Sequence, residues 1–431
     1  MLNIHWFRRD FRFNDNTALH YALNSSNSVL PIFIFDKNIL EKLEDEDDAR
    51  VTFIHHQISS LKEKLEAQGS TLRVFYGEPI EVIDQLTNEL DIAEIYTNRD
   101  YEPYALERDK KVEELCEQRG IGFYTFKDQV IFEKVEILSD SGNCYKVFTP
   151  YSRKWKAKYE ASKPQALPDH EKSTKWYKCK KSTMISLEEM GFSPTSIHLP
   201  SCAIDKKIIS EYSEKRNFPA IKGTTRLGIH LRFGTLGIRE LTAMAVKTND
   251  TWLNELIWRE FYMQVLANFS HVVDRAFKKE YDVIPWRNDE AEFEKWCKGK
   301  TGYPIVDAGM RELNATGFMH NRVRMITASF LTKHLLIDWR WGEAYFARKL
   351  LDFELASNNG GWQWAAGTGT DAQPYFRVFN PQSQTEKFDK ELKYIKKWLP
   401  EYGTPHYPQP MVDHKFARLR AIETYKTALG K

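Results

Sequence analysis

Two short apolar runs, "LNIHWF" at residues 2–7 and "VLPIFIF" at residues 29–35, decide the fold of the first part of the chain. Comparable runs follow at residues 72–76, 92–97 and 122–126 ("LRVFY", "IAEIYT" and "GFYTF"), and helical patterns at residues 50–68, 79–90 and 103–119 separate them. Apolar runs that alternate with helical spacing indicate buried parallel strands joined by helices. The sequence therefore predicts an α/β domain with a Rossmann-like parallel sheet over residues 1–130.

The segment after the first strand, "RRDFRFNDN" at residues 8–16, contains no glycine. A simple dinucleotide fingerprint needs glycines there, because the backbone must approach a pyrophosphate closely. The sheet is therefore predicted to be a scaffold or to hold some other ligand.

The remainder of the chain has a different pattern. Residues 131–203 form a polar, basic connector without periodicity, as in "HEKSTKWYKCKKS" at residues 170–182. From residue 204 the spacing is helical, as in "TWLNELIWREFYMQVLANF" (251–269) and "NRVRMITASFLTKHLLIDW" (321–339), with almost no strand signal. We expect an all-α second domain over residues 204–431.

Composition narrows the class of protein. With 431 residues, 42% of them hydrophobic and 28% charged, the chain is typical of a soluble protein with two domains. Its five cysteines include no C-x-x-C pair, which argues against a disulfide framework and a zinc cage, so no metal site is predicted. The N-terminus has charges where a signal peptide is apolar, and no run is long enough to cross a bilayer. These features predict a cytoplasmic protein without a membrane segment.

The net charge of +2 hides a division between the two parts of the chain. Residues 1–130 contain 15 basic and 25 acidic residues, a net charge of −10, whereas residues 131–431 contain 47 basic and 35 acidic residues, a net charge of +12. Basic side chains that contact phosphates release counterions, so the basic part favours a nucleic-acid partner. An uneven solvated surface is the alternative that charge alone leaves open.

Two motifs in the helical part contain residue types suited to ligand binding. "GTTRL" at residues 223–227 places hydroxyls and backbone N–H groups before a helix, where they could hold a phosphate or only cap the helix. "ELIWREF" at residues 255–261 places Glu255 one helical turn before Trp258. A carboxyl beside aromatic surface can have a raised pKa and act as a hydrogen-bond or proton donor.

The stretch "SNNGGWQWAAGTGTDAQPYF" at residues 357–376 is poor core material. Adjacent glycines lose more backbone entropy on folding than other residues, and asparagine competes locally for backbone hydrogen bonds. Selection for something other than packing is therefore indicated.

Several motifs in this order resemble the photolyase/cryptochrome family, most closely its cyclobutane-dimer photolyases. They are "WFRRDFRFNDN" (6–16), "GTTRL", "ELIWREF", "GKTGYPIVDAGMREL" (299–313), "GFMHNRVRMITASFL" (317–331), "IDWRWGE" (337–343) and "NNGGWQWAAGTGTDAQPYFRVFNP" (358–381). The resemblance implies an N-terminal α/β domain and a helical domain that binds FAD in a folded conformation. It also implies light-driven repair of cyclobutane pyrimidine dimers in DNA, with the reduced anionic FAD as the active form.

The resemblance assigns roles to individual residues. Asn358 would face the flavin nitrogen that changes protonation, Glu255 would hydrogen-bond a pyrimidine carbonyl, and Trp362, Trp339 and Trp286 would relay electrons from the surface. Matches to other FAD contacts are Tyr212, Thr224, Thr225, Arg226, Leu227, Gly228, Trp252, Arg259, Asn321, Arg324, Asp352 and Glu354. Matches to DNA contacts are Trp258, Asn321, Arg322, Met325, Trp364 and Arg377. Gly228 and Glu354 depart from the usual Ser and Asp, and Glu354 puts one flavin contact in doubt.

Some alternatives stay open at this point. A cryptochrome photoreceptor is the second hypothesis, although animal-type cryptochromes have a His-rich pocket where this chain has "MHNRVRM" (319–325), and no long tail follows residue 429. A DNA-binding module without flavin is the third. Some relatives also carry an antenna chromophore, which is a folate, a deazaflavin or a second flavin. Ala105 stands where folate-binding relatives have Glu, which speaks against folate. The expected assembly is a monomer.

Overall fold

The computed structural model describes all residues from Met1 to Lys431, and they form two compact units. The first unit consists of residues 1–136, 156–203 and 226–247, and the second of residues 137–155, 204–225 and 248–431. Each unit is thus assembled from three separate segments of the chain. The domain boundaries at residues 130 and 203 stay a prediction.

The first unit contains one parallel sheet of five strands in the order β3-β2-β1-β4-β5. The strands are β1 (Leu2–Phe7), β2 (Val29–Asp36), β3 (Arg73–Gly77), β4 (Ile92–Asn98) and β5 (Gly122–Phe126). Every residue of β1 and β2 is buried, as expected for the centre of a sheet that is covered on both faces. The predicted strands and the α/β class are confirmed.

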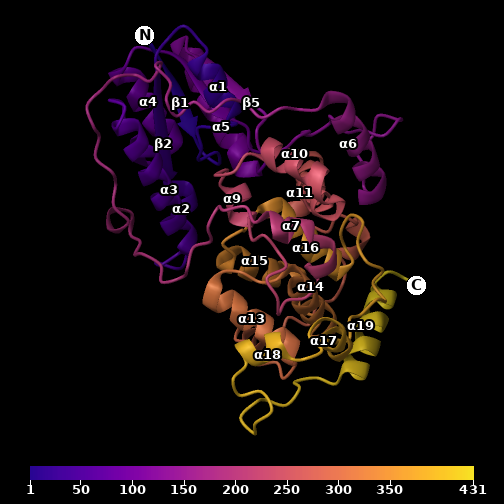
Figure 1. Cartoon of the computed structure of the whole chain (residues 1–431). Coiled ribbons are helices and arrows are strands. Elements are labelled where there is room, and N and C mark those ends of the chain that lie inside the picture. Colours follow the sequence, from indigo (N-terminus) through magenta and orange to yellow (C-terminus); the bar gives the residue numbers. More distant parts are fainter. The chain divides into compact units, whose positions relative to one another are not determined.

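Helices of the first unit cover this sheet (Figure 1). Helix α1 packs on β1, β4 and β5, while α4 packs on β2 and β3 and also against α5. The helices of the whole unit, whether or not they contact the sheet, are α1 (Thr17–Leu23), α2 (Lys37–Leu40), α3 (Ala49–Glu66), α4 (Pro79–Glu89), α5 (Pro103–Arg119), α9 (Gly228–Arg232) and α10 (Ile238–Thr248), with a 3₁₀ turn at Glu188–Met190.

One helix lies in the region that the sequence predicts to be a connector without periodicity. Helix α6 (Phe148–Ser162) carries Tyr151, Trp155 and Tyr159 at four-residue spacing, and all three side chains are buried. The many lysines between these aromatic residues mask the apolar stripe, which explains why the helical pattern was missed.

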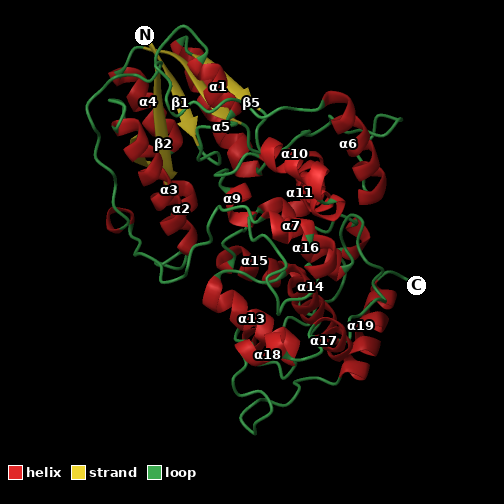
Figure 2. Cartoon of the chain, viewed as in Figure 1, coloured by secondary structure: helices red, strands yellow, loops and turns green.

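The second unit is helical and contains no strand, which confirms the predicted all-α class (Figure 2). Its helices are α7 (Lys206–Ser210), α8 (Tyr212–Lys215), α11 (Asp250–Asn268), α12 (Glu290–Cys297), α13 (Pro304–Thr316), α14 (Asn321–Ser329), α15 (Trp339–Lys349), α16 (Leu355–Ala366), α17 (Pro381–Phe388), α18 (Lys393–Trp398) and α19 (His414–Ala428). Shorter turns lie at Ser270–Val273 and Lys279–Tyr281, and a π-helical turn at Phe330–His334. None of the chain's helices is both long and apolar enough to span a membrane.

Helix α16 is central to the second unit and packs against α11, α14 and α15. Two glycines allow this close approach. A Cβ added to Gly360 would lie 2.2 Å from the Tyr262 ring of α11, and one added to Gly342 of α15 would lie 2.1 Å from the Trp362 ring. Residues 357–364 therefore allow α16 to pack closely against α11 and α15, in addition to any role in ligand binding.

Candidate active site

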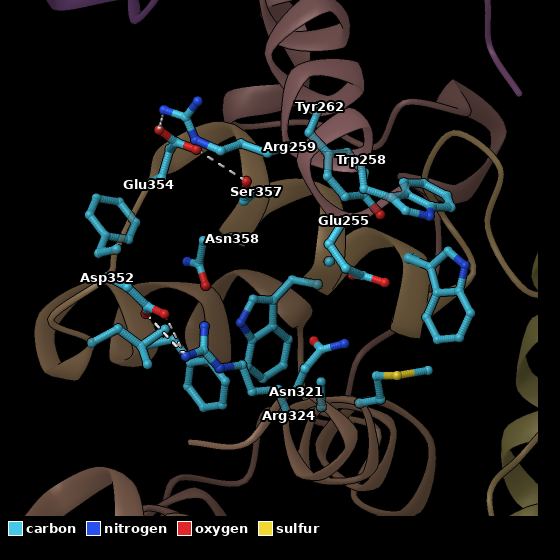
Figure 3. Close-up of a pocket in the computed structure, with 18 of the residues that line it drawn as sticks. Glu255, Trp258, Arg259, Tyr262, Asn321, Arg324, Asp352, Glu354, Ser357 and Asn358 are labelled. Carbon is cyan, nitrogen blue, oxygen red and sulfur yellow. Dashed lines mark hydrogen bonds and ion pairs between the residues drawn. The ribbon is translucent and has the colours of Figure 1, made fainter. Parts of the chain in front are cut away.

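A cavity of about 380 Å³ lies where α11, α14, α15 and α16 meet in the second unit (Figure 3). Apolar and aromatic side chains form much of its wall, and a few charged groups are held in fixed pairs. The lining residues are Arg216, Glu255, Trp258, Arg259, Tyr262, Asn321, Arg324, Met325, Ala328, Phe346, Leu350, Asp352, Phe353, Glu354, Ser357, Asn358, Gly361, Trp362 and Trp364. A mostly apolar cavity with a few convergent polar groups is the usual form of a cofactor site.

Two ion pairs form one side of the cavity. The Arg324 guanidinium donates to both oxygens of Asp352 at 3.0 and 2.9 Å, and its Nε donates to the Met319 carbonyl at 2.7 Å. Arg259 donates to Glu354 at 2.9 Å, and the Ser357 hydroxyl donates to the same carboxylate at 3.3 Å. Both guanidinium groups are therefore held in place, and their charge is available to polar edges of a ligand.

Asn358 lies between these pairs and the opposite wall (Figure 3). Its amide nitrogen donates to Glu343 Oε1 at 2.7 Å and to the Glu343 carbonyl at 3.0 Å. Burial raises the pKa of Glu343 to about 7, although the hydrogen bond from Asn358 acts in the other direction. Since the nitrogen is engaged, the side-chain oxygen Oδ1 is the polar atom that Asn358 offers to a ligand.

Glu255 lies on the side of the cavity opposite Asp352 and Glu354, together with Trp258 (Figure 3). Its carboxyl forms an ion pair with Arg216. Burial raises the pKa of Glu255 despite the opposing effect of the Arg216 charge. Trp258 adds a flat apolar surface here, and Met325 and Trp364 also line the cavity. This side of the cavity thus combines a hydrogen-bonding carboxyl with flat apolar surfaces.

The structure brings half of the predicted residues together. Eleven of them line the cavity: Glu255, Trp258, Arg259, Asn321, Arg324, Met325, Asp352, Glu354, Asn358, Trp362 and Trp364. Others in the second unit do not line it: Tyr212, Thr224, Thr225, Trp252, Trp286, Arg322, Trp339 and Arg377. Arg226, Leu227 and Gly228 belong to the first unit. All the individual roles stay predictions.

The predicted electron relay consists of tryptophans with different exposure. Trp362 and Trp339 are buried, and Trp286 is partly buried with its ring 5.9 Å from that of Tyr425. The tryptophan in ring contact with Trp362 is Trp296, at 6.0 Å between centroids. Trp362 Nε1 is buried without a hydrogen-bond partner in the protein, which suits a wall that faces a ligand.

The sequence prediction missed several residues of this site, above all Arg216, Tyr262, Ser357 and Glu343. Helical spacing could have found one of them, because Tyr262 lies one turn after Trp258. Arg216 gives no such signal, since its partner Glu255 is 39 positions away. Glu343 acts from behind Asn358 and only the structure relates them.

Family models match two parts of the chain. Residues 3–169 match a model described as DNA photolyase, and residues 252–405 match one described as FAD binding domain of DNA photolyase. A deoxyribodipyrimidine photo-lyase of Halobacterium salinarum is 36% identical over all of this chain and all of its own length. One of Synechococcus is 37% identical over 95% of this chain and 93% of its own.

The chain belongs to the DNA photolyase family. Among solved structures, a bacterial class III photolyase from Agrobacterium tumefaciens superposes with a TM-score of 0.88 at 32% identity, covering 100% of this chain and 98% of the other. An archaeal photolyase from Sulfolobus tokodaii with two FAD molecules gives 0.84 at 34%, covering 99% and 100%. A Synechocystis cryptochrome gives 0.87 at 25%, covering 98% and 99%, so this fold is common to repair enzymes and cryptochromes.

The residues of the cavity fit the FAD that the second family model names. A Cβ added to Gly361, which lines the cavity, meets no atom within 4 Å, so the backbone leaves open space at that point. Together with the unpartnered Trp362 Nε1 and the Asn358 oxygen, this gives a flat ring system both room and polar contacts. Arg259, Arg324 and Asn358 are the residues that would hold it.

Proposed function

We propose that this photolyase-family protein repairs cyclobutane pyrimidine dimers in DNA under blue light, with reduced anionic FAD as its cofactor. We further propose that the protein acts as a monomer. The observation that carries the proposal is the division of one cavity into two sides. Asn358 and the two arginine–carboxylate pairs form one side, Glu255 with Trp258 lies opposite, and Met325 and Trp364 add apolar surface to the same cavity. One side suits a flavin, and the other suits a flipped-out lesion next to it.

The apolar side explains how the protein would select its substrate. A dimer cannot be reached inside a duplex, so it must be flipped out, and its damaged pairing lowers the cost. Trp258 and Trp364 then offer surfaces on which bases stack, a contact worth roughly 1–3 kcal/mol per base. Arg322 and Arg377 are the basic residues proposed to contact phosphates of the kinked strand.

When bound and reduced, FAD supplies the light-excited electron that splits the dimer. Glu255 contributes a hydrogen bond to the pyrimidine carbonyl that gains charge, and its raised pKa extends the protonated, donating form to higher pH. Asn358 presents a neutral amide, which contacts an anionic cofactor without placing a full negative charge next to it. Glu255 acts on the charge of the pyrimidine carbonyl and Asn358 on that of the flavin, so the effect of each residue on repair depends on its exact position.

A repair assay tests the proposal. An oligonucleotide with a single thymine dimer is mixed with FAD-loaded, dithionite-reduced protein, and restored thymines are measured after blue light and after darkness. We expect repair only in the light. The cryptochrome hypothesis predicts a light-dependent change of the flavin spectrum with no restored thymines, which would overturn repair as the function.

We also propose that the first unit binds a second chromophore. A cavity of about 160 Å³ lies at the carboxyl ends of β1, β2 and β4, where the winding direction of the sheet reverses, and such switch points are the usual ligand sites of open α/β sheets. Aromatic residues and arginines line it, including Phe33, Phe35, Tyr104 and Arg108. The aromatic part of this lining suits a flat ring system.

Ala105 lines the same cavity and presents only a methyl group, at the position where folate-binding relatives have Glu. We therefore favour a flavin or deazaflavin over a folate in this cavity. Chromatography of chromophores released from purified protein tests this. A second flavin-type species beside FAD supports the proposal, whereas FAD alone at one equivalent, or a folate, contradicts it.

A further inference from the structure

Trp258 is covered on one face by a residue from outside the cavity. The rings of Phe148 and Trp258 are 3.7 Å apart between centroids and 5° from parallel. Aromatic pairs usually have centroids about 4.5–7 Å apart, so these two rings overlap almost completely. Trp258 lines the cavity and Phe148 does not. The indole therefore lies between Phe148 and the cavity.

Phe148 is itself held in place by the turn that follows α16. Its N–H donates to Asp371 Oδ2 at 3.1 Å, and the carbonyl of Lys146 accepts from the Thr370 hydroxyl at 2.6 Å. Helix α16 carries Trp364. The turn after α16 therefore links Phe148, which stacks on Trp258, to the helix of Trp364. The segment 146–148, which the sequence places in a connector, thus becomes part of the cavity's frame.

Other rings hold Trp258 from further directions. Phe261 lies 5.6 Å away at 81°, and Tyr262 lies 5.5 Å away at 34°. Phe148 is the neighbour that stacks parallel to the indole, and so the one that opposes tilting of its plane. A wall that is fixed before binding loses little side-chain freedom when a base stacks on it, which favours affinity.

We propose that Phe148 is a positioning residue for lesion recognition: by stacking on Trp258 it holds the indole as a fixed wall for the flipped dimer. The inference rests on the proposed function and deepens it. It assigns part of the selectivity for damaged DNA to a residue that touches neither the cofactor nor the cavity.

The test compares Phe148→Ala, Phe148→Tyr and a matched control, Phe277→Ala. Phe277 is also partly buried in the second unit and contacts two rings, Phe269 at 5.2 Å and His271 at 6.3 Å, but it does not line the cavity. Dissociation constants of the FAD-loaded protein are measured in the dark for an oligonucleotide with one thymine dimer and for its undamaged equivalent. We expect Phe148→Ala to weaken dimer binding roughly two- to tenfold. Binding of undamaged DNA, Phe148→Tyr and Phe277→Ala should stay within twofold of wild type.

The outcomes separate this inference from the proposed function. A wild-type protein without preference for the dimer contradicts the proposed function, and the inference with it. If wild type prefers the dimer and folded Phe148→Ala keeps the same preference, Phe148 is packing only and the inference is wrong. Equal losses on both oligonucleotides contradict it as well. Should Phe148→Ala fail to fold, Phe148→Leu, which keeps bulk without a ring, is held to the same criterion.

Discussion

Asn358 and Glu343 form a two-point contact between α16 and α15. The Asn358 amide nitrogen donates to the carboxylate of Glu343 at 2.7 Å and to its backbone carbonyl at 3.0 Å. The carboxyl is partly buried, with a pKa raised to about 7 by burial. A group that ionises near neutral pH thus lies directly behind the residue expected to face the flavin.

The first prediction concerns the pH dependence of stability. The pKa of Glu343 is raised from an unfolded value of 4.5 to about 7, so the folded protein holds this proton more tightly. The resulting stabilisation is present below pH 4.5 and is lost as pH rises through 7. For Glu343→Gln, which cannot ionise, unfolding free energies should decline less between pH 5 and 8, with a difference of about 1–3 kcal/mol. Denaturant titrations of both proteins at four pH values measure it, and parallel curves would contradict the raised pKa.

Much of the fold was predictable because the local pattern and the tertiary environment agree. Strand β1 has the predicted bounds, since a buried parallel strand is a continuous apolar run bordered by polar turns. The edge strand β5, which is only partly buried, also has the predicted bounds. Helix α6 was missed because its buried aromatic residues are four positions apart among lysines. Local spacing reports a helix only when the buried stripe is wide.

The candidate site was predictable in part for the same reason. Glu255, Trp258 and Arg259 share one helix, so their common location follows from spacing. Arg216, Glu343 and Phe148 act through contacts that are distant in sequence or lie behind the cavity wall. No local pattern encodes such contacts, because they arise only from the packing of helices.

The second prediction is that Glu255→Ala slows dimer splitting while FAD stays bound. Loss of one hydrogen bond that involves a charged group costs roughly 1.5–3 kcal/mol, or about 10- to 150-fold. Glu255→Gln keeps a donor and should retain more activity, although both variants leave Arg216 without its ion pair. Repair yield per absorbed photon and FAD content are measured together. An unchanged yield with intact FAD would remove Glu255 from the mechanism.

The third prediction separates electron supply from repair. If Trp286, Trp339 and Trp362 relay electrons, Trp286→Phe should block photoreduction of the oxidised cofactor, because Phe is much harder to oxidise but packs similarly. Repair by chemically reduced protein should continue. Bleaching of the flavin under blue light with a thiol reductant measures the relay. Normal bleaching would show that Trp286 only packs, and Trp296, 6.0 Å from Trp362, would then be the next tryptophan to replace.

The fourth prediction is the reverse pattern for Trp364→Ala. Trp364 lines the cavity and is part of the proposed lesion wall, so its loss should weaken binding of dimer-containing DNA by roughly 1–3 kcal/mol through lost stacking. Photoreduction should continue at the wild-type rate. Titration of a dimer oligonucleotide in the dark, next to the bleaching assay, checks both. Wild-type affinity for the dimer would show that Trp364 is not part of the lesion site.

The fifth prediction uses two glycines that differ in what an added methyl group meets. At Gly342 the new Cβ would lie 2.1 Å from the rigid Trp362 ring and 2.6 Å from Leu331, so Gly342→Ala should destabilise the protein by roughly 1–3 kcal/mol. At Gly361 the Cβ meets nothing within 4 Å, so Gly361→Ala should stabilise α16 in the FAD-free protein by about 0.5–1 kcal/mol. Because Gly361 lines the cavity, however, the same methyl group should lower FAD affinity. Thermal unfolding of both FAD-free variants and fluorescence titration with FAD measure these effects. Unchanged FAD affinity for a stabilised Gly361→Ala protein would mean that the cofactor does not approach this part of α16. The side of the cavity that we assign to the flavin would then be wrong.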